Sequence, residues 1–254
     1  MTPRFIFINL YQTKSIEMNK KQCLISFASK GREDYNKAMT RNIEVAKSQG
    51  YTDDFLYYSL DQPREVSGVT IKGGLPLNCP SHQDTPYGFK PFLFKEAFDR
   101  GYRQIIWLDS TIVLARNPQL VFDECKKRGV VAFHNLGHPL EKWISDKAVK
   151  NTGVNLSENP QQIMACVVGF DLENEQGKRI FDKWFALAQD GESFQNNPST
   201  INGFVAHRHD QAILSALLHL EKIPLLPYGS LVYEAHAQGY DGHVPFFINK
   251  GVDK

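Results

Sequence analysis

The feature that most constrains the fold is an alternation of strand-like and helix-like patterns that starts after Lys21. Residues 23–28 form a short apolar run, and residues 35–49 repeat apolar side chains at helical spacing until Gly50. A second apolar run follows at residues 55–60. A strand, a helix and a strand in this order imply a parallel pair with a right-handed crossover. We therefore predict an α/β layer fold with a mostly parallel central sheet flanked by helices.

The alternation continues along the chain. Further apolar runs predict strands at residues 105–109, 130–134 and 165–172. Helical spacing recurs at residues 91–100, 178–187 and 210–220. Residues 61–86 are rich in Gly, Pro, Asp and Ser and have no clear period, so we expect a long loop whose length hints at function. The tail beyond Tyr228 reads as a loop or terminal arm.

Charge and length exclude several classes of protein. The 254 residues include 29 Lys and Arg against 28 Asp and Glu, a net charge of +1. This balance provides no general field for nucleic acid or anionic membranes, because such binding needs a clustered excess of cations. Any anionic ligand must therefore be held locally. The length suits one large domain or two small ones and is sufficient for a sizeable core.

The four cysteines are scattered, without a C-x-x-C pair, which favours reduced thiols, a cytoplasmic location and no structural zinc. The apolar run at residues 5–10 is far shorter than the ~20 residues that cross a bilayer, and no small-residue cleavage site follows it. We predict no secretion signal and no transmembrane segment. Residues 1–20 are an upstream extension or an extra edge strand.

Candidate binding residues follow the predicted strands, because ligands of open α/β sheets lie beyond the carboxyl ends of the strands. Asp109, Ser110 and Thr111 come directly after residues 105–108. A carboxylate and two hydroxyls suit a metal ion that bridges phosphates, or a ribose. The alternative is an ordinary turn in which Asp109 caps the next segment.

The end of the first strand supplies a second group. Ser26, Ala28 and Ser29 are small, and Arg32 and Tyr35 add a cation and a ring on which a nucleotide base would stack. Tyr35 also fits the core face of its own helix, so packing explains it equally well.

Lys90 lies between Phe89 and Pro91, at the expected start of a helix. Its ammonium would be well placed as a point charge for a phosphate. A solvated lysine beside a packed aromatic ring is the alternative.

The strongest helix signal, residues 210–220, begins with Asp210 and Gln211. Asp210 shares a helical face with apolar residues, so its carboxylate points inward and is either a cap or part of a site. His207 and His209 precede it, but an H-x-H pair without a third ligand is a weak zinc signal.

Other nucleotide and hydrolase motifs are absent: the chain has no G-x-G-x-x-G or G-x-x-x-x-G-K-[ST] loop and no G-x-S-x-G elbow. A nucleotidyltransferase would need a glycine-rich basic loop after the first strand, of which residues 29–32 (SKGR) are a thin version.

In order, the segments NIEVAKSQGY, YGFKPFLFKEAFDRGYRQIIWLDSTIVL, VVGFDLENEQGKRIFDKW and HRHDQAILSALL resemble the GT-A class of nucleotide-sugar glycosyltransferases, over roughly residues 21–228. The resemblance implies a Rossmann-like GT-A fold in a single domain over residues 21–254. Residues 21–135 would be the nucleotide-sugar-binding half and residues 136–254 the acceptor-binding half.

The resemblance also implies roles for the candidate residues. Asp109 matches the first acid of the family's D-x-D motif, which contacts the ribose and the metal-bound diphosphate. Thr111 replaces the second acid, so dependence on Mn²⁺ or Mg²⁺ is left open, because hard cations prefer charged oxygens. Lys90 would then neutralise the diphosphate instead.

Asp210 and Gln211 match a D-Q pair that lines the sugar site in such enzymes, which makes Asp210 a general base or a ligand of the donor sugar. Asp171 ends a predicted strand expected to face the same region and is a second candidate base. His207 and His209 would contact the diphosphate or replace the missing metal ligand.

These observations predict a hexosyl- or pentosyltransferase that moves a sugar from a nucleoside diphosphate sugar to a glycan or other hydroxyl acceptor. The alternative, which Thr111 keeps open, is a non-catalytic module of the same fold that binds a nucleotide sugar or a glycan.

Overall fold

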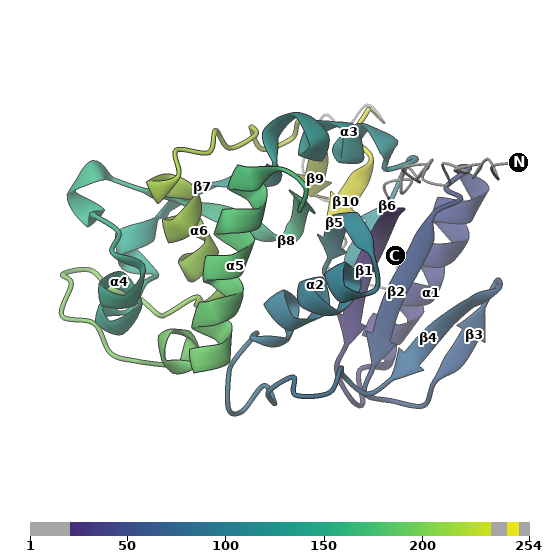
Figure 1. Ribbon diagram of the computed structural model, residues 1–254, viewed down its shortest axis with the longest axis horizontal. Helices are drawn as coiled ribbons and strands as arrows, with labels where there is room; N and C mark the ends of the chain where they lie inside the picture. Colours follow the sequence, from purple (N-terminus) through teal and green to yellow (C-terminus); the bar gives the residue numbers. More distant parts are fainter. Residues whose placement is uncertain (1–20, 235–242, 249–254) are drawn as a thin grey trace, which may run out of the picture.

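The computed structural model describes residues 21–234 and 243–248 (Figure 1). The predicted extension or edge strand at residues 1–20 lies outside them. In chain order the elements are β1 (Lys21–Ala28), α1 (Glu33–Ser48), β2 (Asp54–Ser59), β3 (Arg64–Val66), β4 (Val69–Gly73), α2 (Phe89–Asp99), β5 (Tyr102–Leu108), β6 (Ile112–Leu114), α3 (Gln119–Arg128), β7 (Val130–Pro139), α4 (Asp146–Thr152), β8 (Gln161–Asp171), α5 (Glu175–Asp190), α6 (His209–Leu220), β9 (Val232–Glu234) and β10 (Phe246–Ile248), with short 3₁₀ turns η1 (Leu140–Lys142), η2 (Leu156–Glu158) and η3 (Glu192–Phe194).

A seven-stranded sheet forms the centre of the molecule, in the order β3-β4-β2-β1-β5-β8-β7. The four strands β4, β2, β1 and β5 run parallel, whereas β3, β8 and β7 each pair antiparallel with a neighbour. The predicted α/β class is therefore confirmed. The expected mostly parallel sheet holds only for the central strands, and the sheet as a whole is mixed.

Helices cover both faces of this sheet (Figure 1). Side chains of β1 alternate between the faces, as strand geometry requires. Ile25 and Phe27 join a core with α2, α5 and α6, while Leu24 and Ala28 join the core on the side of α1 and α3. The result is a three-layer arrangement in which the strand ends are the places left open for a ligand.

The C-terminal tail is partly regular, contrary to the prediction of a loop or arm. β10 pairs antiparallel with β6 and parallel with β9, which gives a second sheet in the order β6-β10-β9. Val232 and Phe246 are fully buried in this sheet. This short sheet was not apparent because each of its strands has only three residues and the pairing is long-range.

The predicted loop at residues 61–86 contains a hairpin, β3 and β4. Ser67 and Gly68 form its turn with φ angles of 48° and 76°. A two-residue turn with both φ angles positive is the favoured link between antiparallel strands. The irregular part of the segment is thus shorter than expected and leads from β4 into α2.

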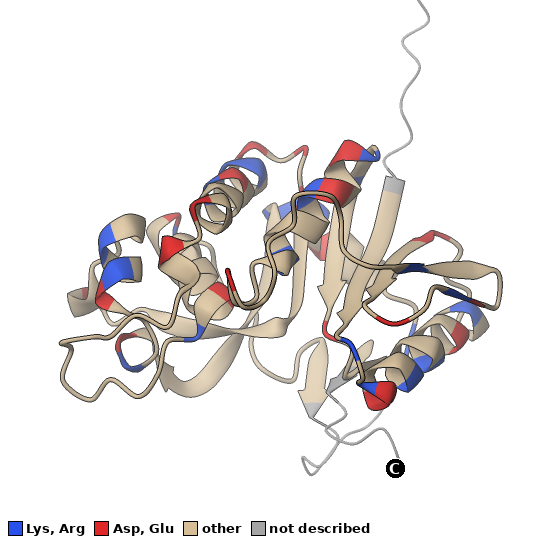
Figure 2. Cartoon of the chain, turned by 90° about the horizontal axis from the view of Figure 1, so that it is seen from below, with Lys and Arg blue, Asp and Glu red and all other residues tan. Residues whose placement is uncertain are grey.

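No helix among residues 21–234 and 243–248 is long and apolar enough to cross a membrane. Lys and Arg alternate with Asp and Glu along the helices in Figure 2, rather than gathering on one face. This mixed pattern agrees with the near-zero net charge of the chain.

Candidate active site

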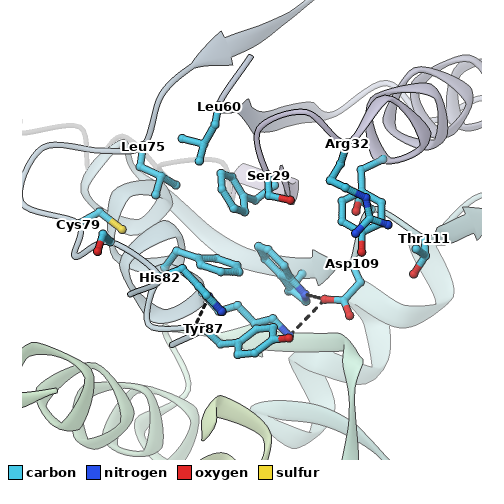
Figure 3. A pocket seen from close by; sticks show the side chains of 16 residues that line it. Ser29, Arg32, Leu60, Leu75, Cys79, His82, Tyr87, Asp109 and Thr111 are labelled. Atoms are coloured by element: carbon cyan, nitrogen blue, oxygen red, sulfur yellow. Dashed lines mark hydrogen bonds and ion pairs between the residues drawn. The ribbon is translucent and has the colours of Figure 1, made fainter. Parts of the chain in front are cut away.

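A cavity of about 660 Å³ lies at the carboxyl ends of the central parallel strands (Figure 3). Ser29 follows β1, Leu60 follows β2 and Asp109 follows β5, so three adjacent strands open into it. Its lining residues are Phe27, Ser29, Arg32, Tyr35, Leu60, Leu75, Cys79, Ser81, His82, Tyr87, Phe89, Lys90, Trp107, Asp109, Ser110 and Thr111. The cavity occupies the position where ligands of open α/β sheets bind.

The segment from the end of β1 to the start of α1 contains five of the predicted donor-binding residues. Ser29, Arg32 and Tyr35 line the cavity, whereas Ser26 and Ala28 do not. Both of the latter are fully buried on the α1 face of β1, and the Ser26 hydroxyl has no hydrogen-bond partner within the described part of the chain. The alternation of the strand therefore turns these two side chains away from the cavity.

Arg32 and Tyr35 lie at the start of α1, beside the mouth of the cavity. The Arg32 guanidinium lies 3.8 Å from the centre of the Tyr35 ring and pairs with Asp34 at 2.7 Å. Tyr35 thus has one face covered by a cation. Because Asp34 offsets the charge of the guanidinium, this geometry presents a flat stacked pair of Arg32 and Tyr35 rather than a bare ring.

Asp109 is held firmly at the exit of β5. Its main-chain N–H donates to Cys166 O at 2.8 Å, and the Trp107 indole N–H donates to its Oδ1 at 2.6 Å. No described residue donates a hydrogen bond to its Oδ2. Ser110 and Thr111 follow in the same tight turn, which Ile112 N–H closes by donating to Asp109 O. One carboxylate oxygen therefore remains available to a ligand.

Lys90 is buried, which corrects the alternative of a solvated lysine. It sits in the first turn of α2, where its ammonium lies 3.2 Å from Asp109 Oδ1, 2.9 Å from Asp210 Oδ2 and 3.0 Å from Ala165 O. Three acceptors thus surround a group that has three N–H donors. The expected contact between Lys90 and a diphosphate would require one of these interactions to break.

This cluster of Asp109, Lys90 and Asp210, called here the ion cluster, carries one more negative than positive charge. Burial lowers the pKa of Lys90, but the two carboxylates outweigh burial and raise that pKa well above its usual range. Burial raises the pKa of Asp210 above its usual range, although the Lys90 ammonium opposes the shift. The Asp210 carboxylate is therefore a stronger base than an exposed aspartate.

A second cavity, of about 400 Å³, lies on the other side of the ion cluster. It shares Tyr87, Lys90 and Asp109 with the first cavity. Its other lining residues are Asn135, Met164, Ala165, Cys166, His207, Arg208, His209, Asp210 and Gln211. His209 and Gln211, which the sequence placed with the donor, thus face this second space, together with Asp210, which it predicted as a general base or a ligand of the donor sugar.

Hydrogen bonds within the protein occupy most of these polar side chains. Gln211 donates to Ile163 O at 2.6 Å, which fixes it between α6 and β8. His207 accepts from Ser145 N–H and bonds Ser193 O through its other nitrogen, and burial lowers its pKa to about 4. His207 is therefore neutral at pH 7 and has no ring nitrogen left for a diphosphate or a metal.

His209 keeps one nitrogen unused. Its Nδ1 bonds Phe194 O at 2.7 Å, and no described residue bonds its Nε2. Its ring stacks on Tyr87, with centres 5.5 Å apart. Tyr87 and His209 both have positive φ angles, 60° and 38°. Such strained backbone concentrates at functional sites, and here it holds two stacked rings at the junction of the cavities.

Sequence reasoning missed His82, which also lines the first cavity. Its Nδ1 accepts from Tyr87 N–H at 3.2 Å, and burial together with the neighbouring His209 lowers its pKa. His82 belongs to the irregular segment before α2, where no periodic pattern singles out a residue. Its only signal was the unusual length of that segment.

Asp171 is not part of this site, and the prediction that it faces the same region was wrong. β8 runs antiparallel to β5, so Asp171 pairs with Gln104 near the start of β5, at the opposite edge of the sheet from Asp109. The Gln104 amide and the Glu173 N–H both donate to its carboxylate. An apolar strand carries no mark of its direction, which is why the sequence pattern placed Asp171 at the wrong edge.

No protein-family model matches the chain, and no curated protein matches its sequence. Among solved structures, the chain is similar to galactosyltransferase LgtC, crystallised in complex with donor and acceptor sugar analogs. The match has a TM-score of 0.46 and 10% sequence identity, and covers 90% of this chain and 87% of that one.

Proposed function

We propose that the protein is a glycosyltransferase that moves a sugar from a nucleoside diphosphate sugar to a hydroxyl acceptor. The observation that carries this proposal is the pair of cavities that meet at the ion cluster. A transfer between two substrates needs two adjoining spaces with a reactive group between them. The ion cluster supplies a carboxylate to each space and links them through Lys90.

In this proposal the first cavity holds the donor. Its mouth offers the Arg32 guanidinium and the Tyr35 ring to a nucleoside, and its floor offers Asp109, Ser110 and Thr111 to the diphosphate and ribose. Aromatic side chains also line this cavity: the ring centre of Phe89 lies 4.6 Å from that of Phe27 and 6.0 Å from that of Trp107. Aromatic faces suit the apolar faces of bases and sugars.

The charges of the ion cluster indicate how the diphosphate would be accommodated. Lys90 is saturated and the cluster is negative overall, so a diphosphate near Asp109 needs an additional cation. The described residues contain no group of three His, Cys, Asp or Glu side chains that would hold a metal by themselves. Asp109 Oδ2 and the neighbouring hydroxyls suit Mg²⁺ or Mn²⁺ whose other ligands are phosphate oxygens and water. When bound, such an ion would offset charge on the leaving diphosphate.

Asp210 is the proposed general base. It lines the second cavity, is nearly fully buried and has a raised pKa, so it would accept a proton from an acceptor hydroxyl more readily than an exposed aspartate. Lys90 would hold the carboxylate in place, since it contacts Asp210 at 2.9 Å. A transfer that retains the sugar's configuration would instead use Asp210 to orient the donor sugar.

The test is a panel of UDP-, GDP- and dTDP-sugars, each with and without Mn²⁺, scored by thermal shift and by release of the nucleoside diphosphate. The proposal expects at least one donor to stabilise the protein and to release its diphosphate faster when an acceptor is present. Stabilisation without release, even with acceptors, would favour a non-catalytic binding module, which the single carboxylate of the D-S-T segment would suit. No stabilisation by any donor would overturn the assignment.

A further inference from the structure

Arg208 stands out among the charged groups of the second cavity. The Lys90 ammonium contacts both Asp109 and Asp210 within the ion cluster. Arg208 also lines this cavity, but no carboxylate in residues 21–234 or 243–248 forms an ion pair with it. Arg208 is exposed, so the second cavity presents at its rim one cation that is paired with no described carboxylate.

Contacts with Trp143 fix Arg208 in place. Its main-chain N–H donates to Trp143 O at 2.9 Å, and its guanidinium carbon lies 4.6 Å from the centre of the Trp143 ring. The His138 ring packs against the same tryptophan, with centres 5.6 Å apart. A guanidinium stacked on a ring keeps the N–H donors in its own plane free, and these donors match the two oxygens of a carboxylate or phosphate.

The other polar groups of the second cavity do not compete for this role. Asn135 donates to Gln162, and Gln211 donates to Gln162 and Ile163. His207 has both ring nitrogens engaged by the main chain. The Nε2 atom of His209, the neighbour of Arg208, has no partner among the described residues and offers a second contact to a ligand.

We propose that the acceptor carries an anionic group, a carboxylate or a phosphate, which Arg208 binds while a hydroxyl of the same molecule faces Asp210. This inference rests on the proposed function and narrows its acceptor class. A charged acceptor would gain a charge-assisted, two-pronged contact at the rim of the second cavity, which a neutral sugar cannot form. Asp210, two residues along the chain, would be within reach of the same small molecule.

A binding experiment tests this inference without requiring turnover. Methyl glucoside, glucuronate and glucose 6-phosphate are titrated against the full chain by ligand-observed NMR, and against Arg208→Gln and Arg208→Lys. We expect at least one of the two anions to bind more tightly than methyl glucoside. Loss of Arg208 should weaken that binding by roughly ten- to a hundred-fold, the range for charge-assisted contacts. Arg208→Lys should retain part of the affinity, because it keeps the charge and loses the planar fork.

Arg41→Gln is the matched control, since Arg41 is exposed on α1 and lines neither cavity. Binding of the anions that is equal to that of methyl glucoside, or equally weakened by Arg41→Gln, would overturn the inference. The two anions separate a carboxylate from a phosphate. If donors fail to bind while the anions still require Arg208, the proposed function fails and the anion site stands.

Discussion

Replacing Lys90 with methionine tests the ion cluster most severely. The change keeps the length of the side chain but removes the only cation that contacts both Asp109 and Asp210 in the described part of the chain. The Asp210 side chain is 6% exposed and Asp109 is 37% exposed, so solvent screens Asp109 and most of the cost falls on Asp210. Removing one partner of a buried ion pair costs about 3–5 kcal/mol.

Lys90→Met also deprives Ala165 O of its hydrogen bond from the ammonium. For a chain of this size, a loss of about 3–5 kcal/mol lowers the melting temperature by roughly 6–20 °C. Urea unfolding at pH 7 gives the free energy directly. Lys95→Met is the control: Lys95 lies on the same helix, α2, but its pair with Asp99 is exposed, so we expect a loss below about 1 kcal/mol.

Two further variants separate charge from packing. Asp210→Asn alone leaves Lys90 and Asp109 as a balanced pair, so its stability should stay within about 1 kcal/mol of the native protein. In the Lys90→Met background, Asp210→Asn removes the unpaired carboxylate charge. The double variant should therefore recover at least half of the free energy of unfolding that Lys90→Met loses. Native stability of Lys90→Met at pH 7 would refute this explanation. A double variant, Lys90→Met with Asp210→Asn, that is no more stable than Lys90→Met alone would also refute it.

The pH dependence of the Lys90→Met variant has a definite sign. A carboxyl whose pKa is raised on folding contributes stability below its unfolded pKa and loses it as pH rises through the folded value. Burial already raises the pKa of Asp210, and removing Lys90 takes away the group that opposes this shift. The gap in stability between Lys90→Met and the native protein should therefore narrow as the pH falls toward 4.

Three other outcomes follow from the structure. Burial lowers the pKa of His207 to about 4 from its usual 6.5, so its neutral ring contributes about 3 kcal/mol to the free energy of unfolding above pH 6.5. This contribution is lost as the pH falls from 6.5 to 4, and urea unfolding of His207→Gln should lack that acid-dependent loss. Gly88→Ala should cost about 1–3 kcal/mol, since its Cβ would lie 2.5 Å from Thr85 Cγ2, and a Thr85→Ser background should reduce that cost in the same assay. Thermal shift with a nucleotide sugar should require Mn²⁺ or Mg²⁺ and should disappear in Asp109→Asn; an undiminished shift without the ion would refute the charge argument for Asp109.

The sequence predicted the elements that surround the site better than it predicted the roles of their side chains. The apolar run at residues 105–109 ends in Asp109, and in the structure Asp109 directly follows the buried strand β5, as the sequence pattern indicates. The inward direction of Asp210 followed equally well from helical spacing. Both acids could therefore be identified as candidate site residues from local sequence patterns alone.

The burial of Lys90 was not recognisable in the same way. Its partners, Asp109 and Asp210, come from β5 and α6, and no local pattern connects them to the start of α2. An isolated lysine is usually exposed, so the sequence alone favours a solvated side chain. Only the packing of α2 against the sheet brings the three charges together.

The misplaced Asp171 and the missed hairpin have different causes. The direction of β8 depends on its long-range pairing with β5, which the apolar run does not encode. The hairpin had a local signal, because Ser67 and Gly68 separate two valines as a two-residue turn does. That signal was hidden by the high Gly, Pro and Asp content of the surrounding residues.

The most direct test of the account is a paired assay of donor binding and acceptor-dependent diphosphate release in Asp109→Asn and Asp210→Asn. We predict that Asp109→Asn loses donor binding, because its carboxylate lines the first cavity. Asp210→Asn should keep donor binding and lose turnover, because its carboxylate serves the second cavity. Native rates of diphosphate release in both variants would contradict the placement of the active site at the ion cluster.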